Sequence, residues 1–112
     1  MGIVRKKMPS CIYFACDAGF GSSAMAAALL RRKLKQAGIR SIQVKNCGIE
    51  DIPEDAELVF ALKQFEELLR RESAACGRTV QFYFVENLME AAETAAEIEI
   101  ETAAETLVKK FL

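Results

Sequence analysis

The chain has 112 residues, of which 52% are hydrophobic and 28% charged, with a formal net charge of −1. This length fits one domain of a folded protein, and a chain so near neutrality lacks the basic surface that nucleic-acid binding needs. No apolar run approaches the ~20 residues of a membrane-spanning helix. We therefore predict a single domain over 1–112, with 1–9 as a flexible N-terminal extension, no nucleic-acid partner, no insertion into a membrane and a cytoplasmic location.

The first predicted strand is the continuous apolar run "CIYFA", Cys11–Ala15, which is typical of a strand buried on both faces of a sheet. A loop rich in glycine and serine follows it. A helix is predicted from about Ser22 to Ala37, because Ala27, Leu30 and Leu34 recur at helical spacing. Gly38 then ends this helix.

The rest of the chain alternates between strand and helix patterns. Further strands are expected at 41–46, 57–62 and 79–85, with helices at 64–75 and from Asn87 onward and a short helical turn between the second and third strands. The segment "EIEIE", Glu97–Glu101, has the period of a strand, but its Ala- and Glu-rich surroundings favour helix.

This order predicts an α/β fold of three layers. We expect a four-stranded, mostly parallel sheet in the order 2-1-3-4, with helices on both faces. Such sheets bind ligands beyond the carboxyl ends of their strands. Cys16 falls at this edge directly after the first strand, and Cys47 falls there after the second.

Cysteine and histidine usage narrows the chemistry. The four cysteines are Cys11, Cys16, Cys47 and Cys76, none forms a C-x-x-C pair, and the chain has no histidine. This pattern disfavours a zinc site and a disulfide framework, so no metal or cofactor is expected. A Cys–His or Ser–His nucleophile pair is impossible without histidine. A disulfide between Cys16 and Cys47 stays open, because both follow parallel strands.

The loop after the first strand has the features of an anion site. Gly19 and Gly21 permit positive φ angles, and the following helix directs its free N–H groups and positive dipole end at the loop. Ser22 or Ser23 is expected to cap that helix. A thiol at a helix N-terminus has a lowered pKa, which makes Cys16 a candidate nucleophile. The predicted phosphate-binding loop comprises Asp17, Ala18, Gly19, Phe20, Gly21, Ser22 and Ser23.

Four interpretations of this loop compete. In the first interpretation Cys16 is an inert buried thiol, which leaves the clustered glycines and serines unexplained. The second interpretation is dinucleotide binding, because "GFGSSA" matches the motif G-x-G-x-x-A. The second strand, however, ends in Lys45-Asn46-Cys47, without the acidic residue that binds the ribose in such proteins. A cysteine phosphatase would need an arginine where Ser22 stands. The fourth is a cysteine that accepts a phosphoryl group and passes it on.

The stretch "ACDAGFGSSAMAAALLRRKLKQAG" resembles the phosphocysteine loop and first helix of mannitol-type enzyme IIB domains of the bacterial sugar phosphotransferase system. The likeness covers roughly Ile12–Val85. It implies an enzyme, a phosphotransferase in which Cys16 is the phosphorylated residue. Phosphate would come from a phosphohistidine of an enzyme IIA protein. It would pass to a hexitol, mannitol by this resemblance, held by a membrane-embedded IIC component with which the chain associates transiently.

Phe20 stands where that family usually has methionine, which makes it a candidate contact for partner proteins. Arg31 and Lys35 on the first helix are further candidates for partner docking. A second class of function remains alongside the enzyme, because a IIB-like domain can also serve as a phosphorylation-sensing module of a regulator.

Overall fold

Four strands form one parallel sheet in the computed structural model, which describes residues 10–17, 21–76 and 80–111, without the side chains at 76 and 102–111. The strands are β1 (Cys11–Cys16), β2 (Gln43–Gly48), β3 (Leu58–Leu62) and β4 (Gln81–Val85). Their spatial order is β2-β1-β3-β4, and every pairing is parallel. The predicted sheet and strand order are confirmed.

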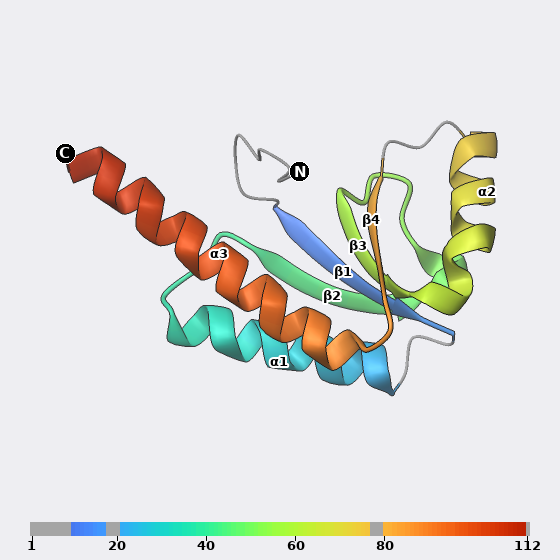
Figure 1. Ribbon diagram of the computed structural model, residues 1–112, viewed down its shortest axis with the longest axis horizontal. Helices are drawn as coiled ribbons and strands as arrows, with labels where there is room; N and C mark the ends of the chain where they lie inside the picture. The colour runs from blue at the N-terminus through green and yellow to red at the C-terminus, as the bar shows by residue number, and fades with distance from the viewer. Residues whose placement is uncertain (1–9, 18–20, 77–79, 112) are drawn as a thin grey trace.

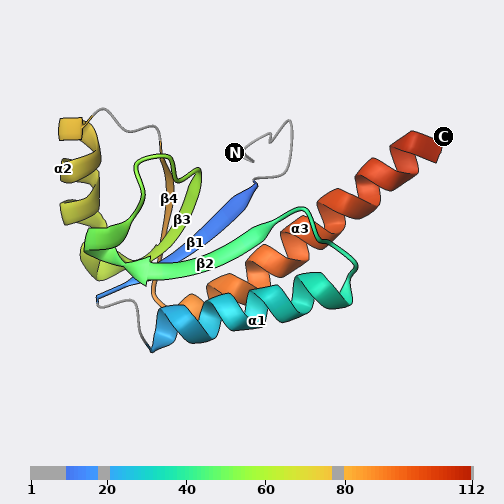
Figure 2. The same ribbon diagram turned by 180° about the vertical axis from the view of Figure 1, so that it is seen from behind.

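Helices cover the sheet on both faces, as predicted (Figures 1 and 2). On one face α1 (Ser22–Gln36) lies beside α3 (Leu88–Phe111), and on the other lies α2 (Glu66–Cys76). The sheet therefore separates two apolar cores. The larger core, on the α1 and α3 side, includes Ile12, Phe14, Cys16, Leu30, Leu34, Phe60 and Leu88. The smaller core, on the α2 side, includes Ala15, Ile52, Val59, Ala61 and Leu69.

The boundaries of several elements differ from the predicted ones, and two short 3₁₀ segments lie between strands and helices. The turn expected between the second and third strands is η1 (Ile49–Asp51). The helix expected from residue 64 begins with η2 (Lys63–Phe65) before α2 proper. The first strand extends one residue further than predicted, so Cys16 is its last residue rather than the first residue after it. The second strand lies two residues later than predicted, which places Cys47 within it.

The ends of α1 are defined by two glycines with positive φ. Gly38 has φ 77°, a left-handed conformation that glycine adopts without steric cost, and its N–H donates to the Lys35 carbonyl. The N–H of Ile39 donates to the Leu34 carbonyl and completes this C-terminal motif. The predicted stop at Gly38 is confirmed. The conformation of Gly21 belongs to the site described below.

The period-two segment is helical, as predicted, but its side chains have an unusual arrangement. In α3 the inward stripe runs through Leu88, Ala92 and Ala95, and the next inward position is Glu99. Glu99 is 2% exposed, whereas Ile98 is 45% and Ile100 37% exposed. The helical period thus places a carboxylate inside and two isoleucines outside.

Candidate functional site at the carboxyl end of β1

Cys16 is the last residue of β1, one of the two central strands of the sheet. The side chain is 6% exposed and belongs to the core on the α1 and α3 side. In a parallel sheet this edge is where the chain leaves each strand, so the loops and helix termini that follow can meet there. The sulfur is therefore held by a rigid strand, beneath the start of the next helix.

Ser23 is a polar partner of this sulfur. The Cys16 Sγ and Ser23 Oγ atoms are 2.9 Å apart, and Ser23 is fully buried in the first turn of α1. Either atom can donate when the thiol is protonated. Once the sulfur is a thiolate it has no hydrogen, so the serine hydroxyl must donate. A buried hydroxyl aimed at the sulfur therefore stabilises negative charge on Cys16.

The N-terminus of α1 carries no side-chain cap, which differs from the expectation that Ser22 or Ser23 would cap it. The N-cap residue is Gly21, and no side-chain hydrogen bond is made there. Ser22 is exposed, and Ser23 turns inward to Cys16 instead. The first turn also has no acidic residue, so no side chain of that turn compensates the positive end of the helix dipole.

Gly21 permits this geometry through its backbone. Its φ is 85° and its ψ −120°, a region that essentially only glycine occupies. A Cβ built on Gly21 would meet nothing within 4 Å, so conformation and not space demands glycine. Its carbonyl accepts the first helical hydrogen bond, from the Met25 N–H at 3.0 Å.

The structure describes only part of the remainder of the predicted loop. Asp17 follows β1 directly and is exposed. Ala18, Gly19 and Phe20 lie outside the described residues, so their predicted roles stay predictions.

The remaining cysteines have different surroundings. Cys47 is paired in register with Ala15 and packs against the core on the α2 side, whereas Cys16 belongs to the opposite core. Their side chains therefore leave the sheet on opposite faces, which argues against the disulfide that the sequence left open. Burial raises the pKa of Cys47 to about 11, helped by the carboxylate of Asp51 and by Cys16. Cys11 begins β1, at the far edge of the sheet.

Arg31 and Lys35 lie away from Cys16. Along α1 they follow Ser22 by about 14 and 20 Å at 1.5 Å per residue. Arg31 also donates from Nε to the Val44 carbonyl at 2.8 Å, which ties α1 to β2. The structure does not bring these two cations to the nucleophile, and their docking role stays a prediction.

The sequence indicated Ser23 as a candidate helix cap and as part of the phosphate-binding loop, but not its direct contact with the sulfur. The sequence carries no local signal for this contact, because a serine in the first turn of a helix is usually a cap. No group of three or more potential metal ligands occurs among the described residues. Within that same part of the chain, no helix is both long and apolar enough to cross a membrane.

Comparison with known proteins identifies the family of this chain. A family model described as "PTS system, Lactose/Cellobiose specific IIB subunit" matches residues 11–99. That match covers well over half of the chain, so the chain belongs to this IIB family of the sugar phosphotransferase system (PTS). The predicted relationship to enzyme IIB domains is confirmed.

Relatives with mannitol in their names share short segments with the chain. Over 49 residues it is 62% identical to the PTS system mannitol-specific EIICBA component of Pasteurella multocida strain Pm70, covering 44% of this chain and 8% of that protein. Over 62 residues it is 47% identical to the PTS system mannitol-specific EIICB component of Staphylococcus carnosus, covering 55% of this chain and 12% of that protein. The chain thus spans only about a tenth of the length of these relatives.

A solved structure supports the fold. The lactose-specific IIB component domain from Streptococcus pneumoniae superposes with a TM-score of 0.58, covering 84% of this chain and 97% of that one. The sequence identity is 13%, so this similarity concerns the fold alone.

Proposed function

We propose that this chain is the IIB phosphoryl carrier of a sugar phosphotransferase system and that Cys16 is its phosphorylated residue. One observation carries the assignment: the buried Cys16 sulfur lies 2.9 Å from the hydroxyl of Ser23, in the uncapped first turn of α1. Family membership over residues 11–99 supports a phosphotransfer role. The donor is a phosphohistidine of a IIA protein, and the acceptor is a sugar held by a membrane IIC component.

The first transfer step uses the thiolate as nucleophile. The Cys16 sulfur attacks phosphorus, a P–S bond forms, and the P–N bond to the donor histidine breaks with its electron pair returning to nitrogen. Phosphoryl transfer depends mainly on positioning and charge stabilisation, which the Ser23 hydroxyl and the free N–H groups at the start of α1 supply. The loop residues Asp17, Ala18, Gly19, Phe20, Gly21 and Ser22 complete the proposed cradle.

The second step returns the enzyme to its starting state. A sugar hydroxyl attacks phosphorus, a P–O bond forms, and the P–S bond breaks to leave the Cys16 thiolate. The hydroxyl proton goes to a base of the membrane partner. The chain works beside that membrane component, at the cytoplasmic face.

Mannitol is the proposed sugar because segments of this chain are 47–62% identical to proteins named mannitol-specific. The lactose-specific structure is only 13% identical. A role as a phosphorylation-sensing regulator would require acceptance of phosphate without delivery to sugar, and no feature of the described residues favours it.

The test is phosphorylation in a reconstituted system. The protein is incubated with phosphorylated HPr and either a mannitol-type or a lactose-type IIA protein, and the phosphate is located by mass spectrometry of peptides. We expect phosphate on Cys16, formed faster from the mannitol-type donor. Phosphate on another residue would overturn the assignment of Cys16, and preference for the lactose-type donor would overturn that of mannitol.

A further inference from the structure

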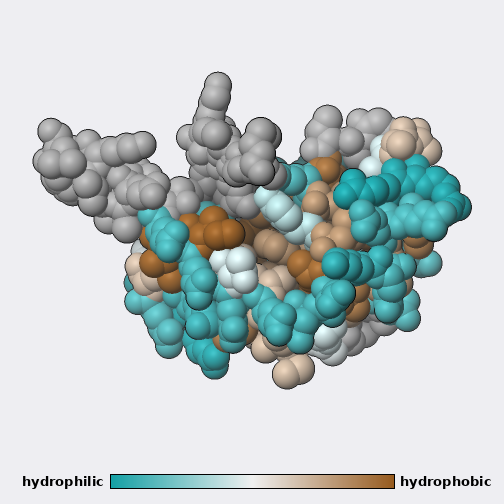
Figure 3. Space-filling view, in the orientation of Figure 1, coloured by the Kyte–Doolittle hydropathy of each residue, from teal (hydrophilic) through white to brown (hydrophobic). Residues whose placement is uncertain are grey.

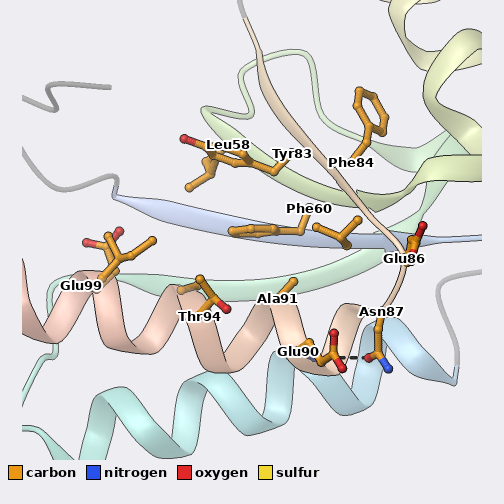
Figure 4. A pocket seen from close by; sticks show the side chains of 13 residues that line it. Leu58, Phe60, Tyr83, Phe84, Glu86, Asn87, Glu90, Ala91, Thr94 and Glu99 are labelled. Carbon is orange, nitrogen blue, oxygen red and sulfur yellow. Dashed lines mark hydrogen bonds between the residues drawn. The ribbon is translucent and has the colours of Figure 1, made fainter. Parts of the chain in front are cut away.

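A groove between β4 and α3 lies outside the site described above. It encloses about 360 Å³ and is walled by the sheet on one side and α3 on the other (Figure 4). Leu58, Phe60 and Tyr83 form its sheet wall. Ala91 and Ile98 contribute to its helix wall. Figure 3 shows apolar surface in the middle of this face, with hydrophilic side chains beside it.

The helix packing explains why this groove exists. α3 packs mainly against α1 and contacts β3, and it leaves the edge strand β4 largely uncovered. All five residues of β4 are partly exposed, in contrast to the buried central strands. The aromatic rings of Phe60 and Tyr83 stack with centroids 5.4 Å apart and make the sheet wall of the groove rigid and apolar.

The charges along the groove have one sign. Its charged lining residues among those described are Glu86, Glu90 and Glu99. Glu99 is 2% exposed and lies at one end, whereas Glu86 and Glu90 are exposed at the other. Lys63 lies 3.6 Å from Glu86 in an exposed ion pair and offsets part of that charge, so Glu90 contributes most to the acidic character of this end. A groove with an apolar sheet wall and acidic residues at both ends is complementary to an occupant that carries apolar and basic side chains.

The groove also opens at the edge of the sheet that carries Cys16. Asn87 and Glu86 follow β4 at its carboxyl end, and Cys16 is the last residue of β1. β1 and β4 are separated by one strand, β3, so the two ends lie about 10 Å apart at normal strand spacing. A protein that reaches Cys16 can therefore contact the groove in the same complex.

We propose that this groove binds a basic, apolar segment of the membrane component that receives the phosphoryl group. The inference rests on the proposed function. Cytoplasmic loops of membrane proteins carry an excess of Lys and Arg close to their apolar spans, and this composition complements the groove. Ile98, 45% exposed at the groove, provides apolar contact, and Glu90 attracts the basic side chains.

Two matched pairs of variants test this surface. Glu90→Lys reverses a charge in the groove, and Glu93→Lys makes the same change at an exposed position of α3 that faces α1. Ile98→Thr removes an exposed isoleucine from the groove, and Ile100→Thr removes one of similar exposure from the α1 side. None of these residues belongs to the phosphoryl-transfer machinery.

The measurement is phosphoryl delivery to mannitol by a detergent-solubilised mannitol-specific IIC component that lacks its own IIB segment. We expect Glu90→Lys and Ile98→Thr to raise the KM of the membrane component for this chain about tenfold, the loss of one strong interfacial contact. Glu93→Lys and Ile100→Thr should stay within about twofold, as surface changes outside an interface do. Phosphoryl uptake from the IIA donor should be the same in all four.

The possible outcomes separate this inference from the proposed function. If Cys16 takes no phosphate, the proposed function fails whatever the groove does. If delivery proceeds and the groove variants match their controls, the groove inference is wrong. It is also wrong if the groove variants impair uptake from the IIA donor instead. A chain without residues 1–9, which include Arg5, Lys6 and Lys7, that delivers with a much lower KM would identify the chain's own start as the occupant and overturn the inference.

Discussion

Cys16 and Cys47 lie on the adjacent strands β1 and β2, both near the carboxyl end of the strand, but their side chains are on opposite faces of the sheet. Cys16 contacts a buried hydroxyl at the positive end of α1, whereas Cys47 packs near Asp51 on the other side, with its pKa raised to about 11. Cys16 is buried and Cys47 is partly buried. The neighbours of each sulfur therefore decide which thiol can hold negative charge.

This difference shows that a position at the carboxyl end of a parallel strand is not sufficient for reactivity. The two-residue period of a strand sends adjacent side chains to opposite layers. Because Cys47 is in register with Ala15 and not with Cys16, it is directed away from the helix N-terminus. A shift of one residue in β2 would bring the second thiol to the same face as the first.

The largest expected effect separates the two cysteines directly. Cys16→Ser should abolish phosphoryl acceptance from a IIA donor, because a serine hydroxyl is not ionised at neutral pH and cannot replace the thiolate. Cys47→Ser should retain acceptance close to that of the unchanged protein. Radiolabel transfer from phosphorylated donor to each variant measures this. Equal loss in both variants would show that the assignment of the nucleophile to one face is wrong.

Alkylation tests the chemical state of Cys47. Its pKa of about 11 lies two units above the ordinary thiol value of 9.0, so at pH 8 its thiolate fraction and its rate with iodoacetamide should be about 100-fold lower than those of a free cysteine. Asp51→Asn should increase the rate, since the Asp51 carboxylate contributes to the shift. Peptide mass spectrometry measures alkylation at each cysteine.

Peptide maps of the protein after mild peroxide treatment should show no disulfide between Cys16 and Cys47. A recovered disulfide between them would refute the placement of the two side chains on opposite faces of the sheet.

Ser23 and Ser22 form the next comparison, between a buried and an exposed hydroxyl on successive residues. Ser23→Ala removes the donor 2.9 Å from the sulfur. A hydrogen bond to a charged group contributes about 1.5–3 kcal/mol, so phosphoryl uptake should slow by roughly 10–100-fold. Ser22→Ala is the matched control and should change uptake little. Stopped-flow or quench measurements of single-turnover transfer decide, and equal rates for Ser23→Ala and the unchanged protein would remove the hydroxyl from the mechanism.

The sheet could be predicted in detail because its strands have strong local patterns. The apolar runs at β1 and β3 are interior strands, and the alternation of strands and helices favours parallel strands joined by right-handed crossovers. Boundaries were less certain where several residues have similar propensity. In β2 the alternation of apolar and polar residues breaks at Asn46, but pairing with β1 continues through Cys47 and Gly48, so the sequence alone did not define where the strand ends.

Within the site, Cys16 and the glycine at position 21 could be identified from the order of strand, loop and helix. The role of Ser23 could not, since a serine near a helix start is usually a cap. Only the three-dimensional register shows that its side chain turns under the strand to Cys16. The groove was hidden for a similar reason, because it depends on α3 packing on α1 and not on β4.

The smallest expected effect is an alkaline loss of stability that originates on the Cys47 face. The folded pKa of Cys47, about 11, lies above its ordinary value of 9.0, so the folded state retains a proton that the unfolded chain loses. Stability is therefore complete below about pH 9 and falls as pH rises toward 11. The effect is modest because this side chain is only partly buried.

Urea unfolding midpoints measured from pH 8 to pH 10 under reducing conditions test this dependence. Cys47→Ala should flatten the decline above pH 9, whereas Cys16→Ser should preserve most of the Cys47 contribution, because burial and Asp51 are the larger causes of the raised pKa. Burial and the neighbouring Cys11 also raise the pKa of Tyr13 from 10.0, so Tyr13 adds its own decline only at higher pH. Tyr13→Phe therefore isolates the Cys47 contribution at the upper end of the range. If Cys47→Ala leaves the slope between pH 9 and 10 unchanged, the thiol on the α2 face is not held protonated by its surroundings.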